Sequence, residues 1–323
     1  MVTSAVITGV AGFIGSHLAE ALLRAGWRVT GIDNFDGFYE RALKLRNLER
    51  VRHGESLEVL EADIRERATI AAMMQAARPA VVFHLAALAG VRPSIQRPDR
   101  FIDVNVNGTG SVLEAARASG CPTVIFASSS SVYGNNQKVP FAEDDPVDQP
   151  ISPYAATKRA GELLCHTYAH LHDLRIACLR FFTVYGPAQR PDLAIMKFMR
   201  LMGSRQPLPM FGDGSTSRDY TYIDDIIGGI LAAREQIETG KFGRCRIWNL
   251  GNSAPITLRG MIDALARVTG IEPIIDHQPM QAGDVERTWA DLRRSNSELG
   301  FRPQTPFEDG LRRQWCWLHD ACQ

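Results

Sequence analysis

The sequence predicts a doubly wound α/β fold, in which helices cover both faces of a parallel Rossmann sheet. Short apolar runs rich in β-branched residues alternate with longer segments whose apolar residues repeat at helical spacing. These apolar runs are continuous rather than alternating, which is typical of strands that are buried on both faces. Glycines directly follow the first run, where nucleotide-binding folds of this class have a phosphate-binding turn.

The expected strands and helices alternate along the first half of the chain. The strands are Ser4–Thr8, Arg28–Asp33, Leu57–Leu60, Ala80–Leu85, Thr123–Ala127 and Arg175–Arg180. The helices are Ile14–Gly26, Arg67–Ala77, Asp99–Ser119 and Ser152–Asp173. This alternation predicts parallel strands, because each helix carries the chain back to the end of the sheet at which the previous strand began.

The pattern changes near residue 185, where Pro and Gly become frequent and short helices and strands mix irregularly. We expect residues 1–182 to form the cofactor-binding domain and residues 183–323 to form a smaller, mixed α/β substrate-binding domain. Residues 221–252, with an expected strand at Arg246–Leu250, are expected to return and pack on the first domain.

Composition excludes several classes of protein. A length of 323 residues suits two domains, and 36 Lys and Arg residues balance 36 Asp and Glu residues. Without a basic excess, nucleic acid is not an expected partner. Six scattered cysteines, with no Cys-x-x-Cys pair and no secretory leader, predict reduced thiols in a cytoplasmic protein without a metal site. No apolar run reaches the ~18 residues of a membrane-spanning helix.

A glycine-rich turn joins the first strand to the first helix. Its glycines are Gly9, Gly12 and Gly15, in the spacing G-x-x-G-x-x-G that is typical of short-chain dehydrogenase sites. Glycine lets the backbone turn tightly and approach a pyrophosphate, which then binds the free N–H groups at the start of the helix. The alternative is an ordinary strand–helix turn.

Two acidic residues follow the next strands. Asp33 ends the second strand, where a carboxylate binds a ribose diol and repels a 2′-phosphate, so NAD is expected rather than NADP. Arg28 and Arg41 are nearby cations that would oppose this preference. Asp63 follows the third strand and either meets the adenine amine or caps a helix. His84, within an apolar strand, is expected to be a hydrogen-bonded core residue.

Tyr154 and Lys158 lie four residues apart, on one face of an expected helix. An unperturbed phenol, with a pKa near ~10, is a poor base at neutral pH. A neighbouring ammonium and a positive nicotinamide ring favour the phenolate and bring it towards the range of a useful base. Ser129, at the end of the fifth strand, supplies a hydroxyl that shares the proton. This combination predicts hydride and proton transfer at a substrate alcohol.

The chain resembles the nucleotide-sugar epimerases of the extended short-chain dehydrogenase/reductase superfamily, and within them the UDP-glucuronate 4-epimerases. The resemblance spans nearly the whole chain. It rests on TGVAGFIGSHLAEALL (8–23), GIDNF (31–35), HLAALAGVRPSI (84–95), ASSSSVYG (127–134), SPYAATKRAGELL (152–164), RFFTVYGPAQRPDLA (180–194), SRDYTYIDDI (217–226) and AGDVERTWAD (282–291).

The resemblance implies a set of roles for individual residues. It implies that Ser129, Tyr154 and Lys158 are catalytic and that NAD stays bound through turnover. Tyr154 and Lys158 also contact the cofactor, together with Gly9, Gly12, Phe13, Ile14, Gly15, Asp33, Asn34, Asp63, Ile64, Leu85, Ala86 and Ala87. The implied substrate contacts are Arg92, Ser129, Ser130, Ser131, Tyr154, Thr183, Arg190, Met210, Phe211, Arg218 and Asp284.

Related enzymes share the oxidation at C4 of the sugar and differ in the fate of the 4-keto sugar. Dehydratases carry Thr-Asp-Glu before Val-Tyr-Gly, and UDP-glucuronate decarboxylases keep the Glu. Here Ser129-Ser130-Ser131 occupies these positions, so elimination across C5–C6 has no acid or base. Oxidation at C4 of a uronate gives a β-keto acid that loses CO2 unless its carboxylate is held. Thr183 and Arg190 are the candidates for holding it, with Ser130 or Ser131 as added donors.

Several of these substrate residues have alternative interpretations. Arg190 could pair with Asp192 or lie on the surface, and Arg92 could form a loop salt bridge. Arg218, implied to bind the diphosphate, could pair with Asp219 or Asp224, while Met210 and Phe211, implied to frame the uracil or ribose, could simply pack. Many relatives carry Arg where this chain has Gln281, and whether Arg287 replaces that cation is open.

The expected reaction is reversible C4 epimerisation of UDP-glucuronate to UDP-galacturonate through a 4-keto intermediate, with NAD tightly bound. The alternatives are a 4-epimerase of UDP-glucose or UDP-N-acetylglucosamine, a UDP-glucuronate decarboxylase, and a nucleotide-binding scaffold without catalysis. The resemblance also implies a homodimer that pairs the helices Asp99–Ser119 and Ser152–Asp173 in a four-helix bundle.

Overall fold

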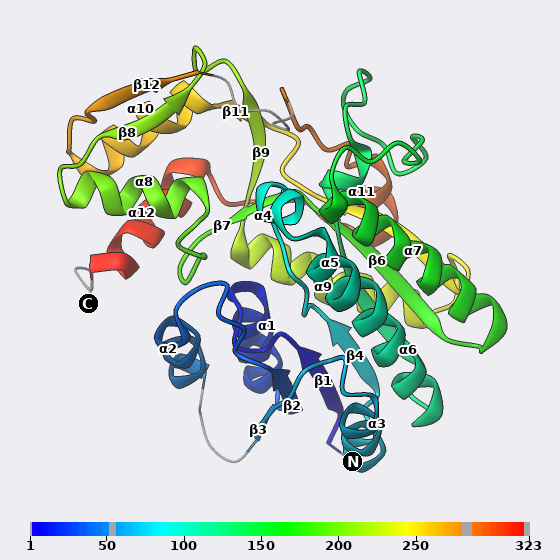
Figure 1. The fold of residues 1–323 in the computed structure, drawn as a ribbon. Coiled ribbons are helices and arrows are strands. Elements are labelled where there is room, and N and C mark those ends of the chain that lie inside the picture. Colours follow the sequence, from blue (N-terminus) through cyan, green and yellow to red (C-terminus); the bar gives the residue numbers. More distant parts are fainter. Residues whose placement is uncertain (1, 52–55, 280–285, 320–323) are drawn as a thin grey trace.

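Seven parallel strands form the central sheet of the computed structural model (Figure 1), which describes residues 2–51, 56–279 and 286–319. Their order is β10-β6-β5-β4-β1-β2-β3, so the direction of winding reverses between β4 and β1. In chain order the strands are β1 (Ser4–Thr8), β2 (Arg28–Asp33), β3 (Leu57–Glu61), β4 (Val81–His84), β5 (Thr123–Ser129), β6 (Arg175–Phe181) and β10 (Cys245–Leu250). The predicted doubly wound fold is confirmed. Ligands in such folds bind at the carboxyl ends of the strands beside this reversal.

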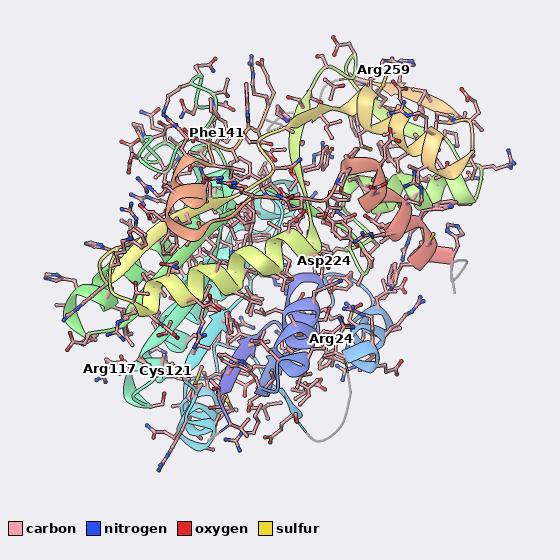
Figure 2. All side chains as sticks on the ribbon, turned by 180° about the vertical axis from the view of Figure 1, so that it is seen from behind. Arg24, Arg117, Cys121, Phe141, Asp224 and Arg259 are labelled. Atoms are coloured by element: carbon pink, nitrogen blue, oxygen red, sulfur yellow. The ribbon has the colours of Figure 1, made fainter. Side chains whose placement is uncertain are left out.

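Helices cover both faces of the sheet. One face packs against α1 (Phe13–Arg24), α2 (Arg41–Val51) and α9 (Ile223–Glu238), and the other packs against α3 (Arg67–Ala77), α6 (Gly108–Ala118) and α7 (Pro153–Leu171). Figure 2 shows α9 lying across its face, with Asp224 in its first turn on the side of Arg24, which ends α1.

The strands are apolar at consecutive positions because each face has its own core. In β1, Ala5 and Ile7 belong to the core under α1 and α9, whereas Val6 between them belongs to the core under α3 and α6. All three side chains are buried, so no alternation with polar residues remains. This is the physical reason for the continuous apolar runs in the sequence.

One expected helix is interrupted. In place of a single helix over Asp99–Ser119, the chain forms α5 (Pro98–Ile102), a π-helical turn at 103–107 and then α6. The short α4 (Val91–Gln96) precedes them. The side chain of Asn105, in that turn, accepts a hydrogen bond from the backbone N–H of Leu88 and donates one to its carbonyl oxygen. This pairing with a distant loop accompanies the wider turn, and no local pattern in the sequence reveals it.

A smaller part of the molecule lies beyond the carboxyl ends of the strands (Figure 1). Its strands are β7 (Thr183–Tyr185), β9 (Ser217–Tyr222) and β11 (Pro255–Thr257) in one sheet, and β8 (Leu208–Phe211) and β12 (Ile275–Gln278) in another. Its helices are α8 (Ala194–Gly203), α10 (Leu258–Thr269) and α12 (Phe307–His319). The short α11 (Arg293–Leu299) packs against α9 and β10.

The cysteines differ in part from the expectation of reduced thiols. Cys121, Cys165, Cys178 and Cys245 are free, but Cys316, in α12, is disulfide-bonded, which corrects that expectation. The absence of a Cys-x-x-Cys pair excludes only that local motif and leaves other bridges possible. None of the described helices is both long and apolar enough to span a bilayer.

Candidate active site

The glycine turn is packed so tightly that side chains do not fit. Gly9 has a φ of +75°, and a Cβ on it would lie 2.9 Å from the backbone nitrogen of Ala86. A Cβ on Gly15 would lie 2.1 Å from the carbonyl oxygen of Gly9. The turn therefore brings bare backbone to the start of α1, as a pyrophosphate-binding turn requires.

Asp33 holds this turn in place from the end of β2. Its carboxylate accepts hydrogen bonds from the backbone N–H groups of Ala11 (3.1 Å) and Phe35 (2.8 Å). The ammonium of Lys44, from α2, lies 3.5 Å from the same carboxylate, and both side chains are almost fully buried. A buried acid beside the turn, with a lysine next to it, suits the two hydroxyls of a cofactor ribose.

Asp63 lies in the pocket but does not cap the following helix, because the residue before α3 is Glu66. Its carboxylate accepts hydrogen bonds from the side chains of Asn34 (2.8 Å) and Arg65 (2.8 and 2.9 Å). The Arg65 hydrogen bond is the main cause that lowers the pKa of Asp63 to about 2. Asp63 is thus a fixed anion at the carboxyl end of β3.

Helix α7 carries the acid–base pair into the pocket. It begins after Ser152, whose hydroxyl accepts a hydrogen bond from the N–H of Ala155 and caps the helix. Tyr154 and Lys158 follow on one face, and both line the cavity. The Lys158 ammonium donates a hydrogen bond to the carbonyl oxygen of Ala127, 2.7 Å away, at the end of β5.

The pKa values of this pair reflect burial. Burial lowers the pKa of Lys158 to about 8. Burial also raises the pKa of Tyr154, although a hydrogen bond with Ser129 and the charge of Arg190 act in the opposite direction. Because burial raises this pKa above its ordinary value, the phenol of Tyr154 stays protonated at neutral pH in the protein alone. Proton abstraction therefore needs further positive charge, which a nicotinamide ring would bring.

The serines at 128–131 line the cavity, at the end of β5 and the start of the turn that follows it. Ser129 lies 2.9 Å from Ser131, hydroxyl to hydroxyl, and accepts a hydrogen bond from the backbone N–H of Ser131. Ser130 begins the short 3-10 turn Ser130–Tyr133, which also contains Ser131. Among the described residues, the lining here contains hydroxyls and no carboxyl group beside Ser129.

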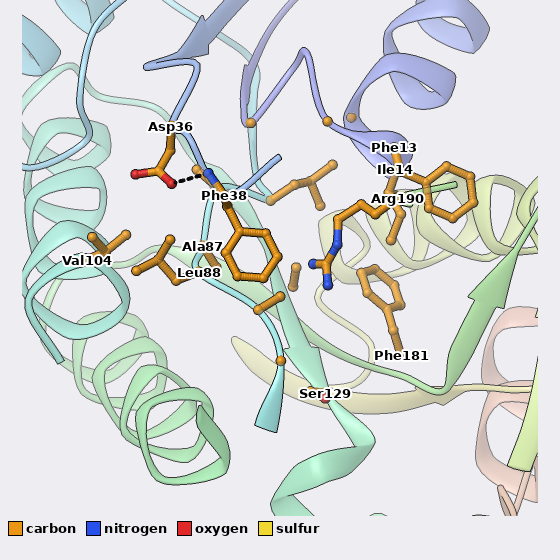
Figure 3. A pocket seen from close by; sticks show the side chains of 18 of the residues that line it. Phe13, Ile14, Asp36, Phe38, Ala87, Leu88, Val104, Ser129, Phe181 and Arg190 are labelled. Atoms are coloured by element: carbon orange, nitrogen blue, oxygen red, sulfur yellow. Dashed lines mark hydrogen bonds between the residues drawn. The ribbon is translucent and has the colours of Figure 1, made fainter. Parts of the chain in front are cut away.

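Arg190 reaches the pocket from the loop after β7 (Figure 3). Its guanidinium donates two hydrogen bonds to Asp192, at 3.0 and 2.7 Å, and lies 5.1 Å from the centre of the Phe38 ring. Thr183, at the start of β7, lines the same cavity. The ion pair with Asp192 is thus present, and Arg190 lies in the pocket as well.

A single cavity of about 490 Å³ collects most of the predicted site residues. It brings together the glycine turn, the ends of β2 to β5, α7 and the loop after β7. The predicted residues that line it are Gly9, Gly12, Phe13, Ile14, Gly15, Asp33, Asn34, Asp63, Ile64, Leu85, Ala86, Ala87, Ser129, Ser130, Ser131, Tyr154, Lys158, Thr183 and Arg190.

Among the described residues, four predicted substrate residues lie outside this lining. Arg92 and Phe211 meet each other, with the guanidinium carbon 5.2 Å from the ring centre. Met210 is buried, and its sulfur lies 3.9 Å from the guanidinium of Arg259. Arg218 donates a hydrogen bond to the carbonyl oxygen of Ser217.

The alternative partners of Arg218 are engaged elsewhere. Asp219 accepts three backbone N–H bonds, and Asp224 lies 3.7 Å from Arg313. Arg287 is exposed, and its backbone forms an isolated parallel β-bridge with Ser217. Asp284, like Gln281, is outside the described residues.

The cavity also contains residues that the sequence interpretation missed, above all Phe38, Tyr39 and Lys44. A signal for α2 was present, because its buried residues Lys44, Asn47, Leu48 and Val51 repeat at helical spacing. The stripe contains Lys and Asn, so it does not resemble an ordinary apolar face. Asn47 donates a hydrogen bond to the carbonyl oxygen of Ala11, within the glycine turn.

His84 is buried and hydrogen-bonded on both ring nitrogens, to Thr8 (2.8 Å) and Thr109 (3.0 Å). Thr109 donates its own hydrogen to the carbonyl oxygen of Asn105, so the ring must donate from Nε2 and accept at Nδ1. It is therefore a neutral imidazole that links β1, β4 and α6.

Comparison with known proteins identifies the class of protein that this fold and pocket define. The family described as the NAD dependent epimerase/dehydratase family matches residues 5–251, and the chain belongs to that family. A UDP-glucuronate 4-epimerase of Thermodesulfobacterium geofontis is 39% identical to it over 97% of this chain and 95% of that protein.

Solved structures agree with this assignment. The crystal structure of a UDP-glucuronic acid 4-epimerase from Bacillus cereus, in complex with UDP-glucuronic acid and NAD, is 35% identical, with a TM-score of 0.90. The match covers 98% of this chain and 99% of that one. A UDP-glucose 4-epimerase of Thermotoga maritima is 30% identical, with a TM-score of 0.89 over 99% of this chain and 100% of that one. The predicted family and its NAD cofactor are thereby confirmed.

Proposed function

We propose that the protein interconverts UDP-glucuronate and UDP-galacturonate by inverting the sugar at C4, without net oxidation. The observation that carries this proposal is the composition of one cavity. It contains a Ser129–Tyr154–Lys158 group together with Thr183 and Arg190, which suit a uronate carboxylate.

Each catalytic side chain has a separate task in this reaction. Tyr154 takes the proton of the C4 hydroxyl, and the Ser129 hydroxyl, which lines the same cavity, shares that proton. Lys158, held by the carbonyl oxygen of Ala127, keeps a positive charge beside the site. NAD, when bound, accepts the C4 hydride and returns it to the opposite face of the 4-keto sugar.

The residues fit this cofactor at three points. The bare backbone at Gly9 and Gly15 suits a pyrophosphate, and Asp33 with Lys44 suits a ribose diol. The Asp33 carboxylate would repel a 2′-phosphate, which favours NAD over NADP. Asp63, with its side chain at the pocket wall, suits the adenine amine.

The 4-keto intermediate of a uronate must be protected from losing CO2. Charge-assisted hydrogen bonds from Arg190, with Thr183 and the hydroxyls of Ser130 and Ser131, restrict rotation of the carboxylate. Loss of CO2 needs the breaking bond perpendicular to the carbonyl plane, so a restrained carboxylate reacts slowly. The absence of a carboxyl side chain beside Ser129, among the described residues, removes the acid and base that a dehydratase needs.

The nucleotide end of the substrate extends towards the smaller part of the molecule. Met210 and Phe211 frame the uracil or ribose, Arg92, already in contact with Phe211, meets the carboxylate or a phosphate, and Arg218 meets the diphosphate. Asp284, outside the described residues, completes this proposed set.

We also propose that the protein is a cytoplasmic homodimer. Exposed apolar side chains on α5 and α7, namely Ile102, Leu163 and Leu171, support a bundle of these helices with those of a second copy. The two helices already pack against each other within one chain.

Incubation of the purified protein with UDP-glucuronate, followed by chromatographic separation of the nucleotide sugars, tests the reaction. We expect UDP-galacturonate as the main product. Predominant UDP-pentose with released CO2 would instead identify a decarboxylase. Turnover of UDP-glucose without turnover of the uronate would identify a neutral-sugar 4-epimerase, and no turnover of any UDP-sugar would favour a scaffold.

A further inference from the structure

The inner face of α7 contacts the end of β5 at three successive helical turns. The ammonium of Lys158, in the second turn, donates a 2.7 Å hydrogen bond to the carbonyl oxygen of Ala127. The carboxylate of Glu162, in the third turn, accepts a 2.6 Å hydrogen bond from the Ser128 hydroxyl. Tyr154, in the first turn, lines the same cavity as Ser129, and the Ser129 hydroxyl acts to lower the pKa of its phenol. The three helix residues, spaced four apart on one face, are Tyr154, Lys158 and Glu162.

Glu162 is the one member of this face to which the proposed reaction assigns no task. Its side chain is fully buried, and Arg180 binds it through two hydrogen bonds of 2.9 and 3.0 Å. Arg159 adds a third at 3.0 Å. Burial raises the pKa of Glu162, but the hydrogen bonds from Arg180, Ser128 and Arg159 outweigh it and hold the pKa below its ordinary value.

Arg180 is itself fixed in position. It is 1% exposed, donates a hydrogen bond to the carbonyl oxygen of Glu143, and lies 4.8 Å from the ring centre of Tyr133. The Tyr133 hydroxyl donates to Asn249 on β10. Because Arg180 is held in place, the Glu162 carboxylate that it binds is a rigid acceptor. It cannot move with Ser128 if Ser128 is displaced.

We propose that Glu162 is a positioning residue for catalysis, which holds Ser128 and thereby fixes the next residue, Ser129, beside Tyr154 in the cavity. The proposal rests on the catalytic roles of Ser129 and Tyr154 in the proposed function. Proton sharing between two hydroxyls depends steeply on their separation, so a small shift of the strand end reduces the rate of the chemical step.

Replacement of Ser128 is the sharpest test, because it removes one hydrogen bond and leaves the Glu162–Arg180 pair intact. We expect Ser128→Ala, in the NAD-containing enzyme, to lower kcat for UDP-glucuronate ~10-fold with KM within ~2-fold. The pH dependence of kcat should move to higher pH, because a weakened Ser129 bond leaves the phenol harder to ionise.

Thr123→Val provides a matched control at the other end of the same strand. The Thr123 hydroxyl is buried and has no hydrogen-bond partner among the described residues, so its removal should leave kcat and the pH profile unchanged. Wild-type kcat and pH profile in Ser128→Ala would overturn the proposal. An equal loss in Thr123→Val would assign the effect to the strand as a whole and would also overturn it.

A readout without substrate separates this proposal from the proposed function. The alkaline absorbance titration of the holoenzyme, taken as the difference from Tyr154→Phe, reports on the Tyr154 phenol alone. Ser128→Ala should raise the pH of its midpoint, and an unchanged midpoint would contradict the positioning role. If the wild type turns over no UDP-sugar, the proposed function fails, and this titration still decides the Glu162–Ser128 relationship.

Discussion

The ammonium of Lys44 lies 3.5 Å from the carboxylate of Asp33, and both groups are buried at the wall of the cofactor pocket. Asp33 alone would place a nearly isolated charge in a pocket of low polarity. The Lys44 ammonium compensates the charge of the Asp33 carboxylate. Together the two groups offer hydrogen-bond donors and acceptors to the same part of the pocket. The pair thus prepares the pocket for a diol without an unpaired buried anion.

Lys44→Met should weaken NAD binding ~10–100-fold, because it removes a charged hydrogen-bond donor and leaves Asp33 without its cation. Residual NAD in the purified protein and calorimetric titration of the NAD-free protein measure the change. Arg41→Met is the matched control, since Arg41 begins the same helix but pairs with the exposed Glu61. Equal NAD affinity in Lys44→Met and wild type would remove Lys44 from the cofactor site.

Arg190→Ala should raise KM for UDP-glucuronate ~10–100-fold, which corresponds to the loss of a hydrogen bond between charged groups. It should also release some UDP-4-keto-pentose, because the carboxylate of the oxidised sugar is less restrained. Kinetics and mass spectrometry of the products measure both effects. Asp192→Asn is an informative companion, as it removes the partner of Arg190 but keeps the guanidinium. Unchanged uronate kinetics and no leaked pentose in Arg190→Ala would contradict the proposed carboxylate contact.

Stability should fall as the pH drops below about 6.5, the ordinary pKa of histidine. Burial is the main cause that lowers the pKa of both His17 and His84 from 6.5 to about 3, with Arg50 and Lys158 respectively as further causes. As the pH falls, both histidines therefore bind protons in the unfolded chain before they do so in the folded protein. The free energy of unfolding decreases by up to about 1.4 kcal/mol per pH unit per histidine until the pH nears 3.

Urea unfolding at pH 7, 6 and 5 measures this loss. In His17→Asn, the decrease in the free energy of unfolding between pH 7 and 5 should be smaller by about the contribution of one histidine. His172→Asn, at an exposed position, should show the same decrease as the wild type. A pH dependence that His17→Asn leaves unchanged would mean that His17 does not contribute.

The proposed dimer predicts a change of mass when charges are placed on the α5 and α7 surface. Ile102→Glu combined with Leu163→Glu should give a monomer in light scattering, because two copies would bury four unpaired carboxylates. Ile274→Glu, at an equally exposed residue in the smaller part of the molecule, should leave the mass unchanged. A dimer that survives the double substitution would exclude this face as the interface.

Much of the cofactor half could be predicted because its signals are local. Strands β1 and β2 have the expected ends, since a buried strand, a glycine turn and a terminal Asp33 are read from adjacent residues. The acid–base pair was equally accessible, because Tyr154 and Lys158 are separated by one helical turn. The domain boundary near residue 182 stays a prediction.

Other features depend on residues that meet only after folding. The π-helical turn at 103–107 involves the contact between Asn105 and the distant backbone of Leu88. The aromatic residue Phe38 enters the pocket because its loop faces Arg190, which lies much later in the chain. No periodicity in the sequence encodes such encounters, so these parts of the site required the structure.

Strand β10 has a consequence for anyone who wishes to divide this enzyme. It pairs with β6 at the rim of the sheet, although it is encoded after β7 to β9, and α9 shields the sheet beside it. A fragment that stops at residue 182 would lack both elements and leave β6 as a bare, apolar edge that invites aggregation. A chimera with new substrate preference should therefore exchange residues 183–222 and 251–323 as two separate blocks and keep the recipient's own 223–250, which contain α9 and β10.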